Sequence, residues 1–341
     1  MKGEVVLDNH MPGGQSKKWD ERFTRDILPL LPQKIAAVLC KLDPAKLDSL
    51  EEIRLRAGKP LILQNYKNEY FIDEDGNLKY SLSRPFITDQ QDLQKTLEIM
   101  SDNSIYAYQD EIRNGYITLR GGHRVGLTGK TIIDGGCVRN IKDISSLNIR
   151  LSGEIPGCSE KILKYLFSKD GSISNTLIIS PPQCGKTTIL RDIARVLSNG
   201  LHESIFKGVK VGIVDERSEI AACFKGIPQN DVGIRTDVLD GCPKTIGMDM
   251  LIRSMSPKVI ITDEIGNDGD RDAIQRVLNA GVKIIASAHG YNVSELKSRR
   301  EVLGLLEEKV FDKLIVLGNS KGPGTIVEVV DGRTIKIQEG V

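Results

Sequence analysis

The sequence carries almost no net charge and few aromatic residues. Its 341 residues include 47 Lys and Arg against 46 Asp and Glu, which gives a formal net charge of +1, and aromatic side chains make up 5%. A nearly neutral chain has no overall electrostatic attraction to nucleic acid or to an anionic membrane, although a local patch could still bind either. Both features therefore disfavour a nucleic-acid motor.

The cysteines form no metal or redox motif. The six are widely scattered, at Cys40, Cys137, Cys158, Cys184, Cys223 and Cys242. No pair has the Cys-x-x-Cys spacing of a zinc site or of a redox motif. We interpret them as free thiols in a reducing compartment.

Long apolar segments are also missing from the sequence. No run approaches the roughly 18 residues of a membrane-spanning helix. The polar, glycine-containing segment from Met1 to Gln15 lacks the apolar centre of a signal peptide. We expect a cytoplasmic protein with no direct membrane span, so that any membrane role depends on partners.

The first half of the chain mixes helical and strand periodicity. Residues 1–20 are expected to be a flexible tail, and residues 21–157 a small α+β domain. Helical spacing is found in Phe23–Leu42, which Pro29 and Pro32 interrupt, and in Gln90–Met100. Apolar residues alternate with polar ones, as in strands, in Glu51–Tyr80 and Gly115–Lys130. Asp75–Gly76 predicts a hairpin turn.

Residues 158–341 change to strands that alternate with helices. The strand candidates are short apolar runs, as expected for strands buried on both faces, at Thr176–Ile179, Val209–Val214, Val259–Thr262, Lys283–Ser287 and Lys313–Leu317. The helix candidates are Thr187–Leu197, Lys244–Met255, Asp270–Ala280 and Val293–Val310. This alternation predicts a doubly wound, parallel α/β core. The core is expected to end in a hairpin of Thr325–Val330 and Thr334–Gln338.

A candidate phosphate-binding loop follows the first of these strands. It consists of Ser180, Pro181, Pro182, Gln183, Cys184, Gly185, Lys186, Thr187 and Thr188. A strand, a tight loop and a helix that opens on Gly-Lys-Thr are the context of a nucleotide P-loop, in which Lys186 contacts the terminal phosphates and Thr187 holds Mg²⁺. Ser180 departs from the pattern, which has glycine there, because serine does not adopt positive φ freely. The alternative interpretation is an ordinary βα turn that contains Gly-Lys-Thr by chance and binds no nucleotide.

Two later strands end in acidic residues. Asp263 and Glu264 follow an apolar strand, and ligands of open α/β sheets bind at the carboxyl ends of the strands. Asp263 would hold Mg²⁺ through water, and Glu264 would act as general base on the attacking water. Asp215, Glu216 and Arg217 follow another strand and would reach the same edge, unless they form only a solvated loop.

His289 and several arginines are further candidates. His289 lies between a strand and Gly290, which suits a residue that senses the γ-phosphate, although a lone histidine is more often structural. Phosphoryl transfer also needs a cation, which a neighbouring subunit often supplies. The candidates for this arginine finger are Arg124, Arg150, Arg217, Arg235 and Arg253, each of which could instead form a surface ion pair.

Taken in order, these motifs resemble those of the stage III sporulation AA family. This family is part of the secretion-ATPase superfamily of type II and type IV secretion and pilus motors. In the second half the resemblance rests on the P-loop and on Val214–Ile220, Pro228–Asp240, Gly247–Pro257, Ile261–Gly266 and Ala288–Gly290. In the first half it rests on Glu52–Arg56, Asn103–Ala107, Gly115–Leu119, Gly122–Gly126 and Ser145–Arg150. It covers the chain from about Leu28 to the C-terminus.

The resemblance implies a fold, an activity and partners. The fold would be α/β, with a RecA-like P-loop ATPase core at residues 158–341 preceded by the smaller α+β domain. ATP and Mg²⁺ would bind at the subunit cleft of a hexameric ring, with Asp215–Glu219 as an acidic box and His289 in a histidine box. Arg124 and Arg150 would be the arginines that complete a neighbour's site.

The family also implies a spore-forming bacterium. The protein would be an ATPase that powers or assembles a mother-cell-to-forespore secretion channel, at the cytoplasmic face of that membrane complex. Its partners would be integral membrane proteins of the channel. Two alternatives stay open, namely an ATP-gated assembly scaffold with little turnover, which Ser180 favours, and a nucleic-acid motor.

Overall fold

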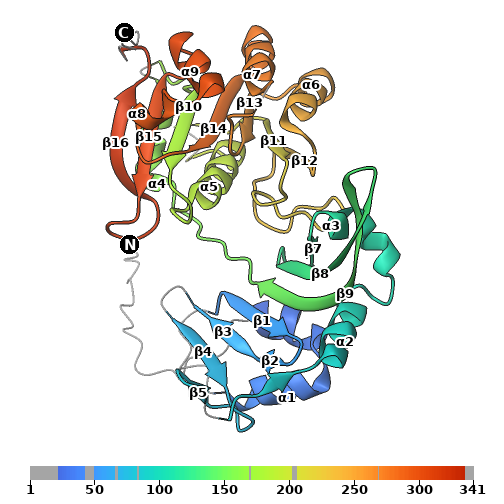
Figure 1. Ribbon diagram of the computed structural model, residues 1–341. Helices are drawn as coiled ribbons and strands as arrows, with labels where there is room; N and C mark the ends of the chain where they lie inside the picture. The colour runs from blue at the N-terminus through green and yellow to red at the C-terminus, as the bar shows by residue number, and fades with distance from the viewer. Residues whose placement is uncertain are drawn as a thin grey trace, which may run out of the picture. The chain divides into compact units, whose positions relative to one another are not determined.

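The structure is a computed structural model in which two compact units are distinguished (Figure 1). It describes residues 22–42, 50–65, 68–82, 84–168, 170–201, 206–267 and 269–334. One unit extends to Ser152 and the other begins at Gly153, a few residues before the predicted border at residue 157. The predicted tail, residues 1–20, lies outside the described residues. Within the described ranges, no helix combines the length and apolar character that crossing a membrane requires.

The first unit is built on a seven-stranded antiparallel sheet with the strand order β5-β4-β3-β1-β9-β8-β7. Its strands are β1 Glu52–Arg56, β3 Ile62–Gln64, β4 Glu69–Ile72, β5 Leu78–Lys79, β7 Tyr116–Thr118, β8 Arg124–Asp134 and β9 Cys137–Arg150. A separate pair joins β2 (Lys59–Pro60) to β6 (Ile87–Thr88). On β1, Ile53 and Leu55 are fully buried while their neighbours are partly exposed, as expected for a strand with one face on a core.

Short helices accompany this sheet. They are η1 Phe23–Ile27, η2 Leu28–Leu30, α1 Gln33–Lys41, α2 Gln90–Met100, η4 Ile105–Tyr108 and α3 Gln109–Arg113. The predicted break at Pro29 and Pro32 is confirmed, since Pro29 lies in the first turn of η2 and Pro32 precedes α1. Helix α2 has its predicted bounds because Asp89 and Asp92 form a capping box at its start. The turn at Asp75–Gly76 joins β4 to β5, as predicted.

The second unit contains a seven-stranded sheet with the order β12-β11-β13-β14-β10-β15-β16 (Figure 1). Its strands are β10 Thr176–Ser180, β11 Val211–Asp215, β12 Thr236–Asp240, β13 Val259–Thr262, β14 Lys283–His289, β15 Lys313–Gly318 and β16 Thr325–Asp331. All neighbours are parallel except β15 and β16. The five predicted strands of the parallel core are confirmed. The first strand of the predicted terminal hairpin corresponds to β16, and its partner lies outside the described residues except for Thr334.

Helices cover both faces of this sheet and enclose two apolar cores. They are α4 Glu160–Leu166, α5 Lys186–Asn199, α6 Lys244–Ser254, α7 Asp270–Asn279, α8 Val293–Leu296 and α9 Arg300–Glu307. The core under α4 and α5 takes Ile178 of β10, whereas the core under α6 to α9 takes Leu177 and Ile179. Strand β10 is therefore buried on both faces, as its continuous apolar sequence predicts.

The prediction of one helix over Val293–Val310 is wrong. The structure has α8 and α9 instead, with Arg299 in an extended conformation between them. The hydroxyl of Ser298 donates to the carbonyl of Glu295 (2.7 Å). Such local side-chain bonds compete with the helical ladder, which gives a physical reason for the interruption.

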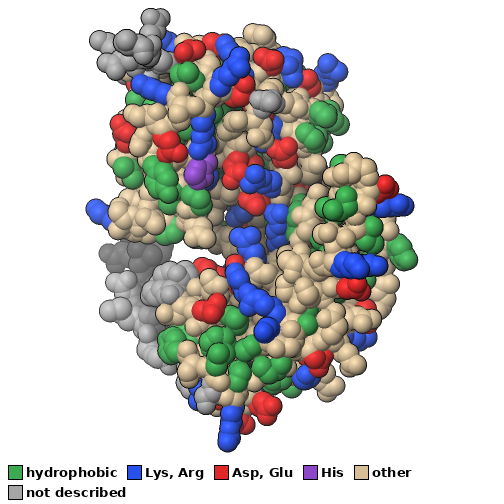
Figure 2. All heavy atoms as spheres, in the orientation of Figure 1, with side chains coloured by type: hydrophobic (Ala, Val, Ile, Leu, Met, Phe, Trp, Pro, Cys, Tyr) green, Lys and Arg blue, Asp and Glu red, His purple; other side chains and the backbone are tan. Residues whose placement is uncertain are grey.

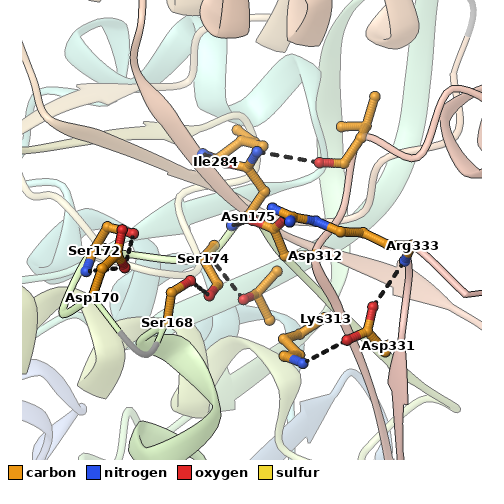
Figure 3. A network of polar contacts seen from close by, with 12 residues as sticks. Ser168, Asp170, Ser172, Ser174, Asn175, Ile284, Asp312, Lys313, Asp331 and Arg333 are labelled. Carbon is orange, nitrogen blue, oxygen red and sulfur yellow. Dashed lines mark hydrogen bonds and ion pairs between the residues drawn. The ribbon is translucent and has the colours of Figure 1, made fainter.

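A polar network joins the amino ends of β10, β14 and β15 (Figure 3). The backbone N–H of Asn175 donates to Asp312 (2.9 Å), and its side-chain oxygen accepts the N–H of Ile284 (3.1 Å). Arg333 donates to the other carboxylate oxygen of Asp312 (2.8 Å). A cavity of about 400 Å³ opens beside these residues. Because Asn175, Asp312 and Arg333 are occupied by these hydrogen bonds, we interpret this edge as structural.

Candidate functional site

The loop between β10 and α5 is tightly wound and anchored from outside. Gly185, the residue before α5, has φ of +82°, which a residue with a Cβ adopts only with strain. The carbonyl of Cys184 accepts the N–H of Gly324 (2.9 Å), so a second segment holds the loop. The first N–H groups of α5 have no intrahelical acceptors, as at any helix start. The loop therefore presents backbone donors and the positive end of a helix dipole together.

The side chain of Lys186 is buried against this loop. Its ammonium donates to the carbonyls of Ser180 (3.1 Å) and Pro181 (3.2 Å), and the residue is 8% exposed. Burial lowers the pKa of Lys186, and the carboxylates of Glu264 and Asp263 act in the opposite direction. A fixed cation thus lies at the base of the loop, with acidic side chains near enough to influence it.

Ser180 does not strain the loop. It is the last residue of β10 and is not among the described residues with positive φ. It pairs in register with His289 of the neighbouring parallel strand, and its carbonyl accepts the N–H of Gly290 (3.2 Å). The conformational restriction expected for serine at this position is therefore absent, because the backbone there is extended.

Strands β11 and β13 end in carboxylates at the same level. Val214 pairs with Thr262 in register, so the next residues, Asp215 and Asp263, leave neighbouring parallel strands together. The oxygens of Asp215 accept the N–H groups of Glu219 and Ala221 (both 2.8 Å), so this carboxylate shapes its own turn. In the view of Figure 2, acidic and basic side chains lie close together on the visible face of the second unit.

The carboxylate of Asp263 is buried and incompletely hydrogen bonded. Asp263 is 2% exposed, and its Oδ2 has no hydrogen-bond partner among the described residues. Burial, together with repulsion from the carboxylates of Asp215, Glu219 and Glu264, raises the pKa of Asp263 to about 7, while the ammonium of Lys244 acts in the opposite direction. An orphaned carboxylate oxygen in such a place fits a cation or its bound water.

Mg²⁺ is compatible with these residues. It is commonly held by one or two carboxylates together with the phosphates of a nucleotide. In the described part of the chain, no three His, Cys, Asp or Glu side chains are grouped as a metal site. Asp263 and the hydroxyl of Thr187, in the first turn of α5, are the protein groups that would hold the ion.

Replacing Asp263 by Asn is expected to stabilise the metal-free protein above neutral pH. The folded-state pKa of about 7 lies above the ordinary value of 3.8, so the folded protein retains a proton that the unfolded chain loses, and wild-type stability falls as the pH rises through this window. The full effect is on the order of 4 kcal/mol as an upper limit. Urea unfolding in EDTA at pH 5 and pH 8 measures the part of this effect that falls between those pH values. Equal pH dependence in the two proteins would show that burial does not disfavour the Asp263 anion.

Glu264 is held in a strained conformation at the same edge. Its φ is +45°, which is uncommon for a residue other than glycine, and its N–H donates to the hydroxyl of Ser287 on β14 (3.0 Å). Its carboxylate forms an ion pair with Arg217 (2.5 Å). Backbone strain of this kind clusters at functional sites. The structure therefore brings the predicted base and one predicted arginine into contact.

Glu216 forms an ion pair with Lys244, the first residue of α6. Lys244 is 4% exposed. Sequence reasoning missed Lys244 because it belongs to no motif. The one available signal was a lysine at the start of a predicted helix, where the helix dipole disfavours a cation.

His289 lies at the carboxyl end of β14, beside the P-loop strand. Its Nδ1 is 3.3 Å from the guanidinium of Arg299, which also contacts Glu295 (3.5 Å). Arg299 is a second residue that sequence reasoning missed, because it lies in the unexpected break between α8 and α9. The histidine is thus placed next to the candidate phosphate site by strand register alone.

Two of the predicted arginines lie away from the loop within the second unit. Arg235 donates to the carbonyl of Ser198 (2.7 Å) and so caps the C-terminus of α5. That end of the 14-residue helix is about 20 Å from the loop. Arg253 is exposed in the last turn of α6.

The other two arginines belong to the first unit, where Arg124 and Arg150 are direct cross-strand partners on β8 and β9. The guanidinium of Arg124 lies 3.6 Å from the ring centroid of Tyr116, and Arg150 lies 3.6 Å from a carboxylate oxygen of Glu52. The two cations are therefore adjacent on one sheet.

The second unit has a RecA-like fold, which solved structures of secretion and pilus ATPases share. The ATPase DotB of Legionella pneumophila matches with a TM-score of 0.51 and 15% identity, over 78% of this chain and 72% of that one. The pilus retraction motor PilT, solved with bound ADP, matches with a TM-score of 0.50 and 16% identity, over 85% and 77%. At these identities the likeness shows the fold alone, and it confirms the predicted fold class.

The chain belongs to the family described as sporulation stage III, protein AA, whose model matches residues 21–337. The stage III sporulation protein AA of Bacillus subtilis (strain 168) is 42% identical over 306 residues, which are 90% of this chain and 94% of that protein. The resemblance inferred from the ordered motifs is therefore confirmed.

Proposed function

We propose that this protein is an ATPase that powers or assembles a mother-cell-to-forespore secretion channel during sporulation. The observation that carries the proposal is the buried ammonium of Lys186 at a helix-opening loop, on the same sheet edge as the orphaned oxygen of Asp263. Family membership and the secretion-ATPase fold supply the biological setting. The reaction is hydrolysis of ATP to ADP and phosphate.

Each group at the edge has a proposed role. Backbone N–H groups of residues 183–188 bind the phosphates, and Lys186 contacts the terminal ones. Thr187 and Asp263 hold Mg²⁺, which neutralises phosphate charge when bound. Glu264 orients the attacking water and accepts its proton. His289 senses the γ-phosphate from the neighbouring strand.

The assembly that we propose is a hexameric ring at the cytoplasmic face of a membrane complex, with integral membrane proteins of the channel as partners. Arg124 and Arg150 are the candidates to complete a neighbour's site, because they are adjacent cations on one sheet. Arg235 is a weaker candidate than these two, since it is bonded to the end of α5 within its own subunit.

Purified full-length protein is expected to release phosphate from ATP in Mg²⁺ and to stop releasing it in EDTA. Phosphate release under both conditions tests the proposal directly, and absence of release in Mg²⁺ would contradict it. Adding DNA at low and high salt tests the alternative of a nucleic-acid motor, which requires salt-dependent affinity and stimulated turnover.

A further inference from the structure

The turn after β11 carries two charged side chains to two different elements. Its base is fixed because Asp215 accepts the N–H groups of Glu219 and Ala221. Ser218 has φ of +54°, and its N–H bonds back to the carbonyl of Asp215 (3.3 Å). On this turn, Glu216 pairs with Lys244 of α6, and the next residue, Arg217, pairs with Glu264 after β13.

Lys244 occupies an unfavourable place for a lysine. It is almost fully buried, and lysines are seldom buried unless they are paired. It is also the first residue of α6, where the helix dipole repels a cation. The backbone beneath it is firmly placed, because α6 packs so closely on β11 that a Cβ at Gly247 would lie 2.6 Å from Val214. The ion pair with Glu216 offsets part of the free-energy cost of burying the Lys244 ammonium. Because the backbone at Lys244 is rigidly packed, this ion pair also fixes the position of Glu216.

Arg217, in contrast, reaches Glu264 from a partly exposed side chain. Its side chain is 56% exposed, and an exposed ion pair restrains a long side chain only weakly. Its neighbour Glu216 is bound to a buried, fixed ammonium. The backbone of the turn is therefore anchored one residue away from Arg217, which limits the positions from which the guanidinium can reach Glu264.

Resting on the proposed function, we propose that Lys244 is a positioning residue for the general base. Its ammonium fixes Glu216, the turn thereby places Arg217, and Arg217 holds the carboxylate of Glu264 in one orientation at the carboxyl edge. Helix α6 is connected in this way to the reacting water without touching the nucleotide.

Lys244→Met removes the charge and keeps much of the side-chain volume. It is expected to speed amide hydrogen exchange at residues 216–218, since this part of the turn loses an anchor while Asp215 still accepts the N–H groups of Glu219 and Ala221. The kcat for ATP should fall roughly tenfold or more while the Kd for a fluorescent ATP analogue changes less than about twofold, because misorientation affects the chemical step rather than binding. Glu216→Gln should have the same effects, and the double variant should lose no more than either single one.

Asp249→Asn is the matched control. It breaks an exposed ion pair between α6 and Arg276 (2.8 Å) and leaves the turn intact, so exchange and kcat should stay at wild-type values. A second variant, Lys244→Met with Glu216→Met, separates positioning from stability. Replacing an ion pair that has a buried partner, here Lys244, by apolar residues often preserves stability, so the Tm of this variant should approach that of the wild type while the turn still exchanges fast and kcat stays low.

Three results would overturn the inference. The first is an unchanged rate of amide exchange of the turn in Lys244→Met. The second is fast exchange in Lys244→Met together with a wild-type kcat. The third is that both Tm and kcat return to wild-type values in the variant that combines Lys244→Met with Glu216→Met. If the wild type hydrolyses no ATP, the proposed function fails and with it the role for Glu264. The exchange measurement then still shows whether Lys244 anchors the turn.

Discussion

Lys186→Ala is expected to abolish ATP hydrolysis. The ammonium lies buried on the carbonyls of Ser180 and Pro181, and in the proposed function it contacts the phosphoryl group on which charge develops. Removing one such preorganised group costs about 10³-fold in kcat. Nucleotide affinity should fall as well, because the terminal phosphates lose their cation. Phosphate release and titration with a fluorescent ATP analogue measure the two effects.

Lys258→Ala is the control for this variant. Lys258 is exposed and immediately precedes β13, at the amino edge of the sheet and away from the loop. It should hydrolyse ATP as the wild type does, and thermal melting should show that both variants are folded. Wild-type turnover in a folded Lys186→Ala protein would contradict the assignment of the loop.

Glu264→Gln is expected to bind ATP and to lose turnover. Glutamine keeps the shape of the side chain but cannot accept the proton of the attacking water, and general base catalysis contributes about 10²- to 10⁴-fold. The ion pair with Arg217 is partly exposed, so losing it should cost less than about 1 kcal/mol of stability. Single-turnover hydrolysis and analogue binding distinguish the lost chemical step from lost affinity.

Glu308→Gln provides the comparison for Glu264→Gln. Glu308 pairs with Arg271 beside the cavity at the amino edge, so it resembles Glu264 in chemistry and differs in place. Its substitution should leave turnover unchanged. Undiminished hydrolysis in Glu264→Gln would rule out the base assignment. A Glu264→Gln strain that sporulates normally would instead favour the ATP-gated assembly scaffold. That alternative no longer gains support from Ser180, since the backbone at Ser180 is unstrained.

Much of the fold could be predicted from local sequence. Strand β13 and helix α2 have the predicted bounds, because one is a buried apolar run and the other starts at a capping box. Strand β12 was missed because its sequence is Thr-Asp-Val-Leu-Asp and it lies half-exposed at the sheet edge. The break between α8 and α9 depends on a side-chain bond from Ser298, which periodicity does not reveal.

The candidate site was predictable where it depends on strand ends. Parallel strands share a carboxyl edge, so the sequence alone places Lys186, Asp263 and His289 near one another. The direction of a side chain within that edge was not predictable. The carboxylate of Asp215 bonds its own turn, and Lys244 reaches the edge through the packing of α6 on β11, which only the folded chain determines.

The proposed function requires that the site hydrolyse ATP within an assembly of several subunits. The most direct test measures particle mass and phosphate release in the same sample of full-length protein, across a range of protein concentrations, with and without ATP and Mg²⁺. Nucleotide is expected to form or tighten a hexamer, and turnover per subunit is expected to rise with assembly. A protein that stays monomeric and hydrolyses ATP at the same rate per subunit at every concentration would contradict the proposed function.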